Sequence, residues 1–165
     1  MGLNQKPIPF KMRLVLATLI VFLISAISLT SQARQSEPER VKAVIEQLFD
    51  GMRKSNSTKV SATFTEEAIM QTVVKDENNE VQIRSGNLQA FLNAIGSEKE
   101  EIWDERISGY DINIDGELAT VWTPYQFYVG DEFSHCGVNS FQLVKKDGDW
   151  KIFFIVDTRR QDNCV

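Results

Sequence analysis

Hydrophobic residues recur every three or four positions from Ser36 to Arg53, with polar residues between them. This spacing places the hydrophobic side chains on one face of a helix. Ser36 and Glu39 have the spacing of a capping box, and Pro38 falls in the first turn, where proline is tolerated. The pattern predicts a helix over 36–53 that packs on a core. Its apolar stripe consists of Val41, Val44, Ile45, Leu48, Phe49 and Met52.

Shorter segments follow this helix. We expect a short helix over 58–64 and two short strands over 69–74 and 81–84, separated by polar turn residues. Ser85 is expected to cap a further helix, which ends at Gly96. This half of the domain therefore contributes helices and one short pair of strands.

From residue 102 onward, β-forming residues dominate. Long runs over 102–114 and 117–129 flank Asp115-Gly116, and a hairpin over 133–160 turns at Asp147-Gly148. If each Asp-Gly pair forms a two-residue turn, the turn fixes which residues face each other; a three-residue turn would shift the pairing by one. The expected facing pairs are Ile112–Ala119, Tyr110–Val121, Phe141–Phe154, Leu143–Ile152 and His135–Arg160.

The order of elements predicts an α+β fold. Helices come first and a four-stranded antiparallel meander follows, so the helices should cover one face of the sheet. Pro124 inside a long run marks an edge, a bulge or a bend, because proline cannot donate to the ladder. The last strand, 151–156, is almost wholly apolar, so its second face should be covered by a second subunit or by the tail.

The first 33 residues have the layout of a secretory signal peptide. Three basic residues precede an apolar run over 14–27, and Ser31-Gln32-Ala33 offers small residues at the cleavage positions. The alternative is an uncleaved anchor, but the run is shorter than the roughly 20 residues that span a bilayer. We therefore expect an exported domain over 34–165, periplasmic or secreted, that contacts a membrane only through an uncleaved leader.

The expected mature domain is acidic, with 15 basic against 23 acidic residues and a net charge of −8. This balance argues against a nucleic-acid partner, which requires clustered Lys and Arg. Export permits a disulfide, and the expected hairpin brings Cys136 near Arg159, with Cys164 a few residues beyond. A bridge between the two cysteines is geometrically possible, and two free thiols are the alternative. One histidine and two cysteines form no zinc spacing, so we expect neither a metal nor a cofactor.

Two residues are candidates for acid–base chemistry. His135 has an ordinary pKa near 6.5 and suits a general base or a hydrogen-bonding group for a ligand. Asp157 follows an apolar strand, where burial and a nearby cation would tune it. The alternatives are a structural histidine and a structural ion pair of the carboxylate with Arg159, Arg160 or Arg106.

Other residues are candidates for holding a ligand. A guanidinium suits a carboxylate or a phosphate, and alternation along a strand sends only one of Arg159 and Arg160 into a pocket. Trp103, Trp122 and Tyr125 are aromatic residues that suit stacking on a flat ligand, as does Tyr128. The alternative is that they are ordinary aromatic residues of the core or rim.

Three segments carry a resemblance to a known family: Trp122–Tyr128, Phe133–Gly137 and Trp150–Arg160. They resemble the nuclear transport factor 2-like (NTF2-like) superfamily, and within it small exported bacterial proteins of the SnoaL-like and putative lumazine-binding groups. The resemblance implies a cystatin-like, cone-shaped curved sheet wrapped by the N-terminal helices. It also implies a pocket at the open end and, often, a dimer formed through the sheet.

These observations favour an exported domain that binds a small apolar or aromatic ligand and forms a homodimer. One alternative is an isomerase, cyclase or dehydratase that uses His135 or Asp157 as general base. Another is a dimerisation module without catalysis. The sequence leaves open whether the protein is an enzyme, because this fold supports all three functions.

Overall fold

The computed structural model describes residues 35–164, and the expected leader lies outside them. Within that part of the chain, no helix is long and apolar enough to cross a membrane. The helices are α2 (Glu37–Arg53), α3 (Ser57–Ser61) and α4 (Leu88–Gly96). The strands are β1 (Phe64–Lys75), β2 (Val81–Gly86), β3 (Trp103–Ile107), β4 (Asp111–Asp115), β5 (Leu118–Val129), β6 (Glu132–Lys146) and β7 (Asp149–Thr158).

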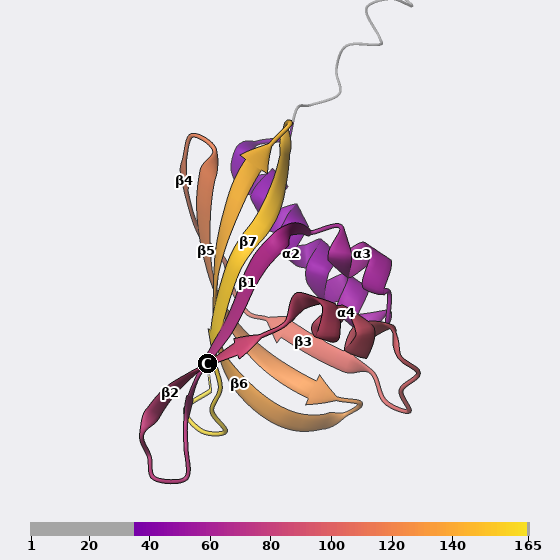
Figure 1. Ribbon diagram of the computed structural model, residues 1–165, viewed down its shortest axis with the longest axis vertical. Coiled ribbons are helices and arrows are strands. Elements are labelled where there is room, and N and C mark those ends of the chain that lie inside the picture. The colour runs from indigo at the N-terminus through magenta and orange to yellow at the C-terminus, as the bar shows by residue number, and fades with distance from the viewer. Residues whose placement is uncertain (1–34, 165) are drawn as a thin grey trace, which may run out of the picture. The chain divides into compact units, whose positions relative to one another are not determined.

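One curved sheet carries the domain, in the order β2-β1-β7-β6-β5-β3, with β4 also paired to β5. Strands β1 and β7 are parallel, and the other pairs are antiparallel. Figure 1 shows the helices on one side of this sheet, and we call that side its inner face. The α+β prediction with the helices on one face is confirmed.

The expected strand over 102–114 is divided in two. The break at Ser108 lies opposite Pro124, whose carbonyl accepts a hydrogen bond from the Ser108 backbone N–H at 3.0 Å. Strand β3 pairs with one half of β5 and β4 with the other, so the sheet changes direction at this proline. Proline at this position thus marks a bend, one of the three possibilities that the sequence left open.

The β4–β5 turn corrects the first expected register. The turn residues are Gly116 and Glu117, because Gly116 has the positive φ of 57° that the first position of a type II′ turn requires. Ile112 therefore faces Val121 instead of Ala119. The shift is two residues, so each side chain stays on its expected face.

The β6–β7 hairpin follows its expected register only near the turn. Asp147 and Gly148 both have positive φ, as a two-residue type I′ turn requires, and Leu143 faces Ile152 as expected. Beyond that pair, β7 holds one extra residue at Phe153, and every later pair is shifted by one.

This bulge corrects two further pairs. Phe141 faces Ile155 instead of Phe154, and Arg160 lies opposite Cys136 instead of His135.

The core lies between α2 and the inner face of the sheet. The predicted stripe of α2 is buried there, and Phe49 meets the ring of Phe141 edge-on at 6.2 Å. Asn87, not Ser85, caps α4, because β2 continues to Gly86 and the Asn87 side chain accepts a hydrogen bond from the Ala90 N–H. The short helix ends at Ser61 rather than at residue 64.

Candidate functional site

A pocket of about 320 Å³ lies between the inner face of the sheet and helices α2 and α4. Its apolar lining consists of Leu48, Phe49, Met52, Phe64, Met70, Ala90, Phe91 and Ile155. Its polar lining consists of Gln71, Thr72, Asn87, Glu105, Asn139, Asp157 and Arg159. The helices therefore supply only Asn87 to the polar set, from the start of α4, and most polar groups come from the sheet.

Four polar residues face one another across neighbouring strands β1, β7, β6 and β5. We call this set the polar row: Thr72, Asp157, Asn139 and Thr123. The bulge at Phe153 brings Asp157 into it, since without the extra residue Asp157 would pair with Val138, whose side chain belongs to the other face. A backbone irregularity therefore sets the chemistry of the pocket.

Asp157 is held from three directions. Thr72 Oγ1 donates to Oδ1 at 2.5 Å, Arg159 Nε donates to Oδ2 at 2.9 Å, and the Tyr125 hydroxyl lies 3.3 Å from Oδ2. The residue is only 9% exposed. These contacts fit the structural ion pair with Arg159 that the sequence offered as an alternative to catalysis.

The Tyr125 hydroxyl donates to the Thr158 carbonyl at 2.9 Å. Burial and the nearby carboxylates of Asp157 and Glu105 raise the pKa of Tyr125 well above its ordinary value. The hydroxyl therefore remains protonated and acts as a donor.

Glu105 is the acidic residue that sequence reasoning missed. It projects from β3 into the pocket, and its Oε1 accepts a hydrogen bond from Asn139 Nδ2 at 2.6 Å. Burial raises the pKa of Glu105 to about 7, and the negative charge of Asp157 adds to this effect, while Asn139 and Arg159 oppose it. A signal was present, because Glu105 lies two residues from each of the apolar residues Trp103 and Ile107 and therefore shares their face of the strand.

Arg159 lines the pocket, and Arg160 does not. Arg160 instead donates through Nε to the Asn163 carbonyl at 3.2 Å, as alternation along the chain predicts. Within residues 35–164, the terminal guanidinium nitrogens of Arg159 have no hydrogen-bond partner. They are therefore available to a ligand.

His135 lies beside the pocket and is not part of its lining. Its ring packs on Phe127 at 5.0 Å and on Tyr125 at 5.7 Å, and Ser134 Oγ lies 3.0 Å from Nδ1. Burial lowers the pKa of His135, Arg159 lowers it further, and Asp157 opposes both. The ring is therefore neutral at pH 7, and it contacts aromatic side chains instead of the cavity.

The aromatic residues of the pocket differ from those expected. Trp122 lies on the outer face of the sheet, which corrects its expected position in the pocket. Trp103 packs edge-on against Phe127 at 6.3 Å and is also outside the lining. The lining aromatics are Phe49, Phe64 and Phe91. Sequence reasoning assigned Phe49 to the core, because the hydrophobic spacing of a helix is the same whether that face covers a core or a cavity.

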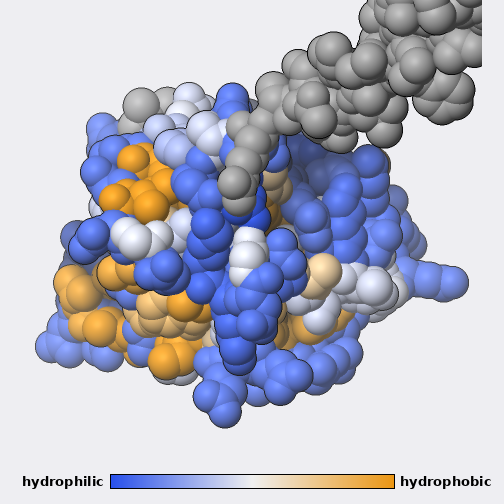
Figure 2. Space-filling view, turned by 90° about the horizontal axis from the view of Figure 1, so that it is seen from above, coloured by the Kyte–Doolittle hydropathy of each residue, from blue (hydrophilic) through white to orange (hydrophobic). Residues whose placement is uncertain are grey.

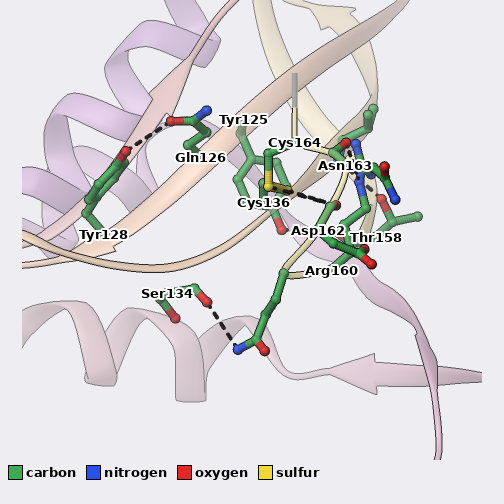
Figure 3. The surroundings of a disulfide bond; sticks show 12 residues. Tyr125, Gln126, Tyr128, Ser134, Cys136, Thr158, Arg160, Asp162, Asn163 and Cys164 are labelled. Atoms are coloured by element: carbon green, nitrogen blue, oxygen red, sulfur yellow. Dashed lines mark hydrogen bonds between the residues drawn. A yellow bond between two sulfur atoms is a disulfide. The ribbon is translucent and has the colours of Figure 1, made fainter.

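A disulfide joins Cys136 to Cys164, with a Cα–Cα distance of 5.7 Å (Figure 3). Backbone hydrogen bonds of 2.8 and 2.9 Å also connect Cys136 and Arg160. Next to this bridge, a β-carbon on Gly137 would lie 1.8 Å from the Thr158 carbonyl oxygen, so only glycine fits. The chain on either side of Arg159 is thereby fixed to β6.

Comparison with known proteins identifies the family. A sequence model of the family described as "Putative lumazine-binding" matches residues 36–154. No curated protein matches this chain.

Solved structures share the fold at low identity. An NTF2-like protein from Cytophaga hutchinsonii has a TM-score of 0.62 at 11% identity, over 76% of this chain and 100% of its own. The β subunit of a putative aromatic-ring-hydroxylating dioxygenase from Novosphingobium aromaticivorans has a TM-score of 0.61 at 9% identity, over 74% and 88%. A putative scytalone dehydratase from the same species has a TM-score of 0.58 at 16% identity, over 76% and 85%. The chain therefore belongs to the putative lumazine-binding family and has the NTF2-like fold.

Proposed function

We propose that this domain binds a small, mainly apolar ligand in the pocket of about 320 Å³, with the polar group of the ligand at Glu105 and Arg159. The observation that carries the proposal is the division of the lining. The helices contribute mainly apolar side chains, and the sheet contributes Phe64, Met70 and Ile155 together with a few convergent polar groups, as in small-molecule sites. The description of the family and the similarity to a putative dehydratase support a site for a small molecule.

A fluorescence titration with the uncharged dye N-phenyl-1-naphthylamine tests this function. We expect saturable binding with one dye per domain. Ala90→Trp places a large ring in the pocket and should weaken binding at least about tenfold. Asn93→Trp, on the exposed face of α4, is the matched control and should bind as the unmodified protein does. Equal binding by both variants would mean that the dye does not bind in this pocket, which would contradict the proposal.

A homodimer formed through the outer face of the sheet is part of the proposal. Large apolar residues are exposed on that face, including Ile69 at 54%, Trp122 at 53% and Ile83 at 66%. Figure 2 shows hydrophobic surface gathered on the sheet side and a mainly hydrophilic surface on the helix side. Exposed apolar residues gathered on one face indicate a partner. Light scattering should give a dimer that Trp122→Arg dissociates, whereas Gln89→Arg on α4 should leave it intact.

Export is also proposed. The leader-like residues 1–33 and the disulfide between Cys136 and Cys164 support it, because disulfides persist in oxidising compartments. Intact mass measurement of the protein recovered from the exported fraction tests both features at once. A mass that begins at Arg34 and lacks two hydrogens is the expected result, and a full-length chain in the membrane fraction would contradict cleavage.

A second candidate function is proton transfer on the bound ligand, in an isomerase, cyclase or dehydratase. Glu105 favours it, because a carboxyl that titrates near neutral pH suits a general base. Asp157 suits that role less well, since both of its oxygens already have partners. Deuterium exchange from solvent into the α-carbon of a bound apolar ketone, lost in Glu105→Gln, is the expected signature.

A further inference from the structure

We infer that the pocket selects ligands whose polar group is an uncharged carbonyl, and that Glu105 and Arg159 donate hydrogen bonds to it. The inference rests on the proposed binding function and names the chemical class of the ligand. Three observations carry it: the charge balance of the polar lining, the free donors within it, and the state of the surrounding titratable groups.

The charge balance disfavours an ionic head group. The polar lining holds two carboxyl groups, Glu105 and Asp157, and one guanidinium, Arg159. Asp157 already forms an ion pair with that guanidinium at 2.9 Å. A ligand carboxylate would therefore meet a cation whose charge is balanced and two acidic groups beside it. A ligand ammonium would meet the terminal nitrogens of Arg159.

The free donors favour an acceptor. Asn139 is the only hydrogen-bond partner of Glu105 among residues 35–164, and it occupies Oε1, so Oε2 is available. Burial keeps this carboxyl protonated up to about pH 7, and a protonated carboxyl donates from its second oxygen. Arg159 offers its terminal nitrogens to the same cavity. Two donors facing an apolar cavity match a carbonyl oxygen.

The strands around Glu105 hold three other titratable groups. Asp157 is ion-paired with Arg159, Tyr125 stays protonated, and His135 is already neutral. On its own strand, Asp104 and Arg106 form an ion pair at 2.7 Å.

Helix α2 contributes the remaining charges. Glu46, Asp50 and Arg53 line a second cavity, which Glu105 also lines. Each is engaged in an ion pair: Glu46 with Lys42, Asp50 with Lys54 and Lys59, and Arg53 with Asp104. Among these acidic residues, all within the described part of the chain, Glu105 is thus the one without an ion pair, and burial raises its pKa to about 7.

Four naphthalene probes of nearly equal size test the inference: 2-acetylnaphthalene, 2-naphthoate, 2-(aminomethyl)naphthalene and 2-ethylnaphthalene. Each displaces the dye at about pH 6 and about pH 8.5, on either side of the titration of Glu105. At the lower pH, the ketone should bind about tenfold more tightly than the carboxylate or the amine, and more tightly than the hydrocarbon. At the higher pH, its advantage over the hydrocarbon should shrink, because Glu105 no longer donates whereas Arg159 still does.

Glu105→Gln keeps a hydrogen-bond donor at this position but removes the negative charge that Glu105 gains at higher pH. Glutamine donates at both pH values, so the variant should keep the preference for the ketone and lose its pH dependence. Glu117→Gln, in an exposed turn, is the matched control and should retain that dependence. Arg159→Met gives a second test on a half-exposed side chain and should weaken ketone binding at both pH values.

The outcomes distinguish a failure of this inference from a failure of the proposed binding function. If the hydrocarbon binds but the carboxylate equals the ketone, the inference is overturned and the binding function stands. If Glu105→Gln keeps the pH dependence of the unmodified protein, Glu105 is not the donor and the inference is also overturned. If Ala90→Trp leaves binding of the dye itself unchanged, the proposed pocket function fails as well.

Discussion

Two rows of the same sheet use the same four strands for opposite purposes. The core row consists of Phe64, Ile152, Leu143 and Ala119, and all four are buried. The polar row, further along β1, β7, β6 and β5, supports a cavity instead of filling it. The comparison teaches that stability and recognition are separated along the strands. One row excludes water by close packing, and the other keeps donors and acceptors in fixed positions.

The largest expected effect comes from emptying the core row. Leu143→Ala should lower the free energy of unfolding by about 3–5 kcal/mol, because it leaves a cavity where no solvent can enter. Urea unfolding measures this loss. Leu118→Ala, at an exposed position of β5, is the matched control and should cost less than about 1 kcal/mol. A similar loss in both variants would contradict the separation of the two rows.

The next effect belongs to Glu105, beside the polar row. Its pKa is raised on folding from 4.5 to about 7, so the folded state holds this proton more tightly than the unfolded chain does. Stability should therefore fall as pH rises from about 4.5 to 7, by up to about 3 kcal/mol, and should lose nothing more from this group above that range. Glu105→Gln should remove this slope. Urea unfolding of both proteins across the range measures it, and parallel curves would exclude the linkage.

Asp157→Asn sharpens the comparison by changing the charge in the polar row while nearly keeping its shape. We expect a loss of about 1–3 kcal/mol in unfolding free energy, since Arg159 and Thr72 lose a charged acceptor. Asp131→Asn, at an exposed turn, serves as the control. Equal stability of the two variants would mean that Asp157 contributes nothing to folding.

The smallest effect has the opposite sign. The Thr123 hydroxyl is fully buried and has no hydrogen-bond partner within residues 35–164. Thr123→Val replaces it with a methyl group of the same shape and should raise stability by about 1 kcal/mol. Thr120→Val, exposed on the opposite face of the same strand, should change little. A destabilised Thr123→Val would show that this hydroxyl is satisfied by an ordered water.

Much of the fold was predictable because its signals are local. The stripe of α2 and the Asp147-Gly148 turn each follow from a few neighbouring residues. The bulge at Phe153 was not predictable, because residues 151–156 are nearly all apolar. Two pairings of this segment with β6 that differ by one residue both place apolar side chains on each face, so the sequence does not distinguish them. Thr72 and Asn139 were missed for the same reason, because their pairing with Asp157 depends on that shift.

Glu105 escaped prediction for a different reason. Its neighbours Asp104 and Arg106 are also charged, and three charged residues in a row are typical of a solvent-exposed strand. Only the pairing of β3 with β5 turns this carboxyl inward. The ion pair of Asp157 with Arg159 was among the alternatives that the sequence offered. The contacts that hold Asp157 in place come from Thr72 and Tyr125, which are distant in sequence and could not be predicted.

The bulge also makes the pocket sensitive to the length of β7 and not only to its composition. Deleting the single residue Phe153 would keep every other side chain of the strand, but each side chain after this position would move to the opposite face of the sheet. Asp157 and Arg159 would then lie on the outer face, and Val156 and Thr158 would face the helices. In genetic terms, the loss of one codon would remove the ion pair of Asp157 and Arg159 from the pocket and place it on the surface proposed for the second subunit.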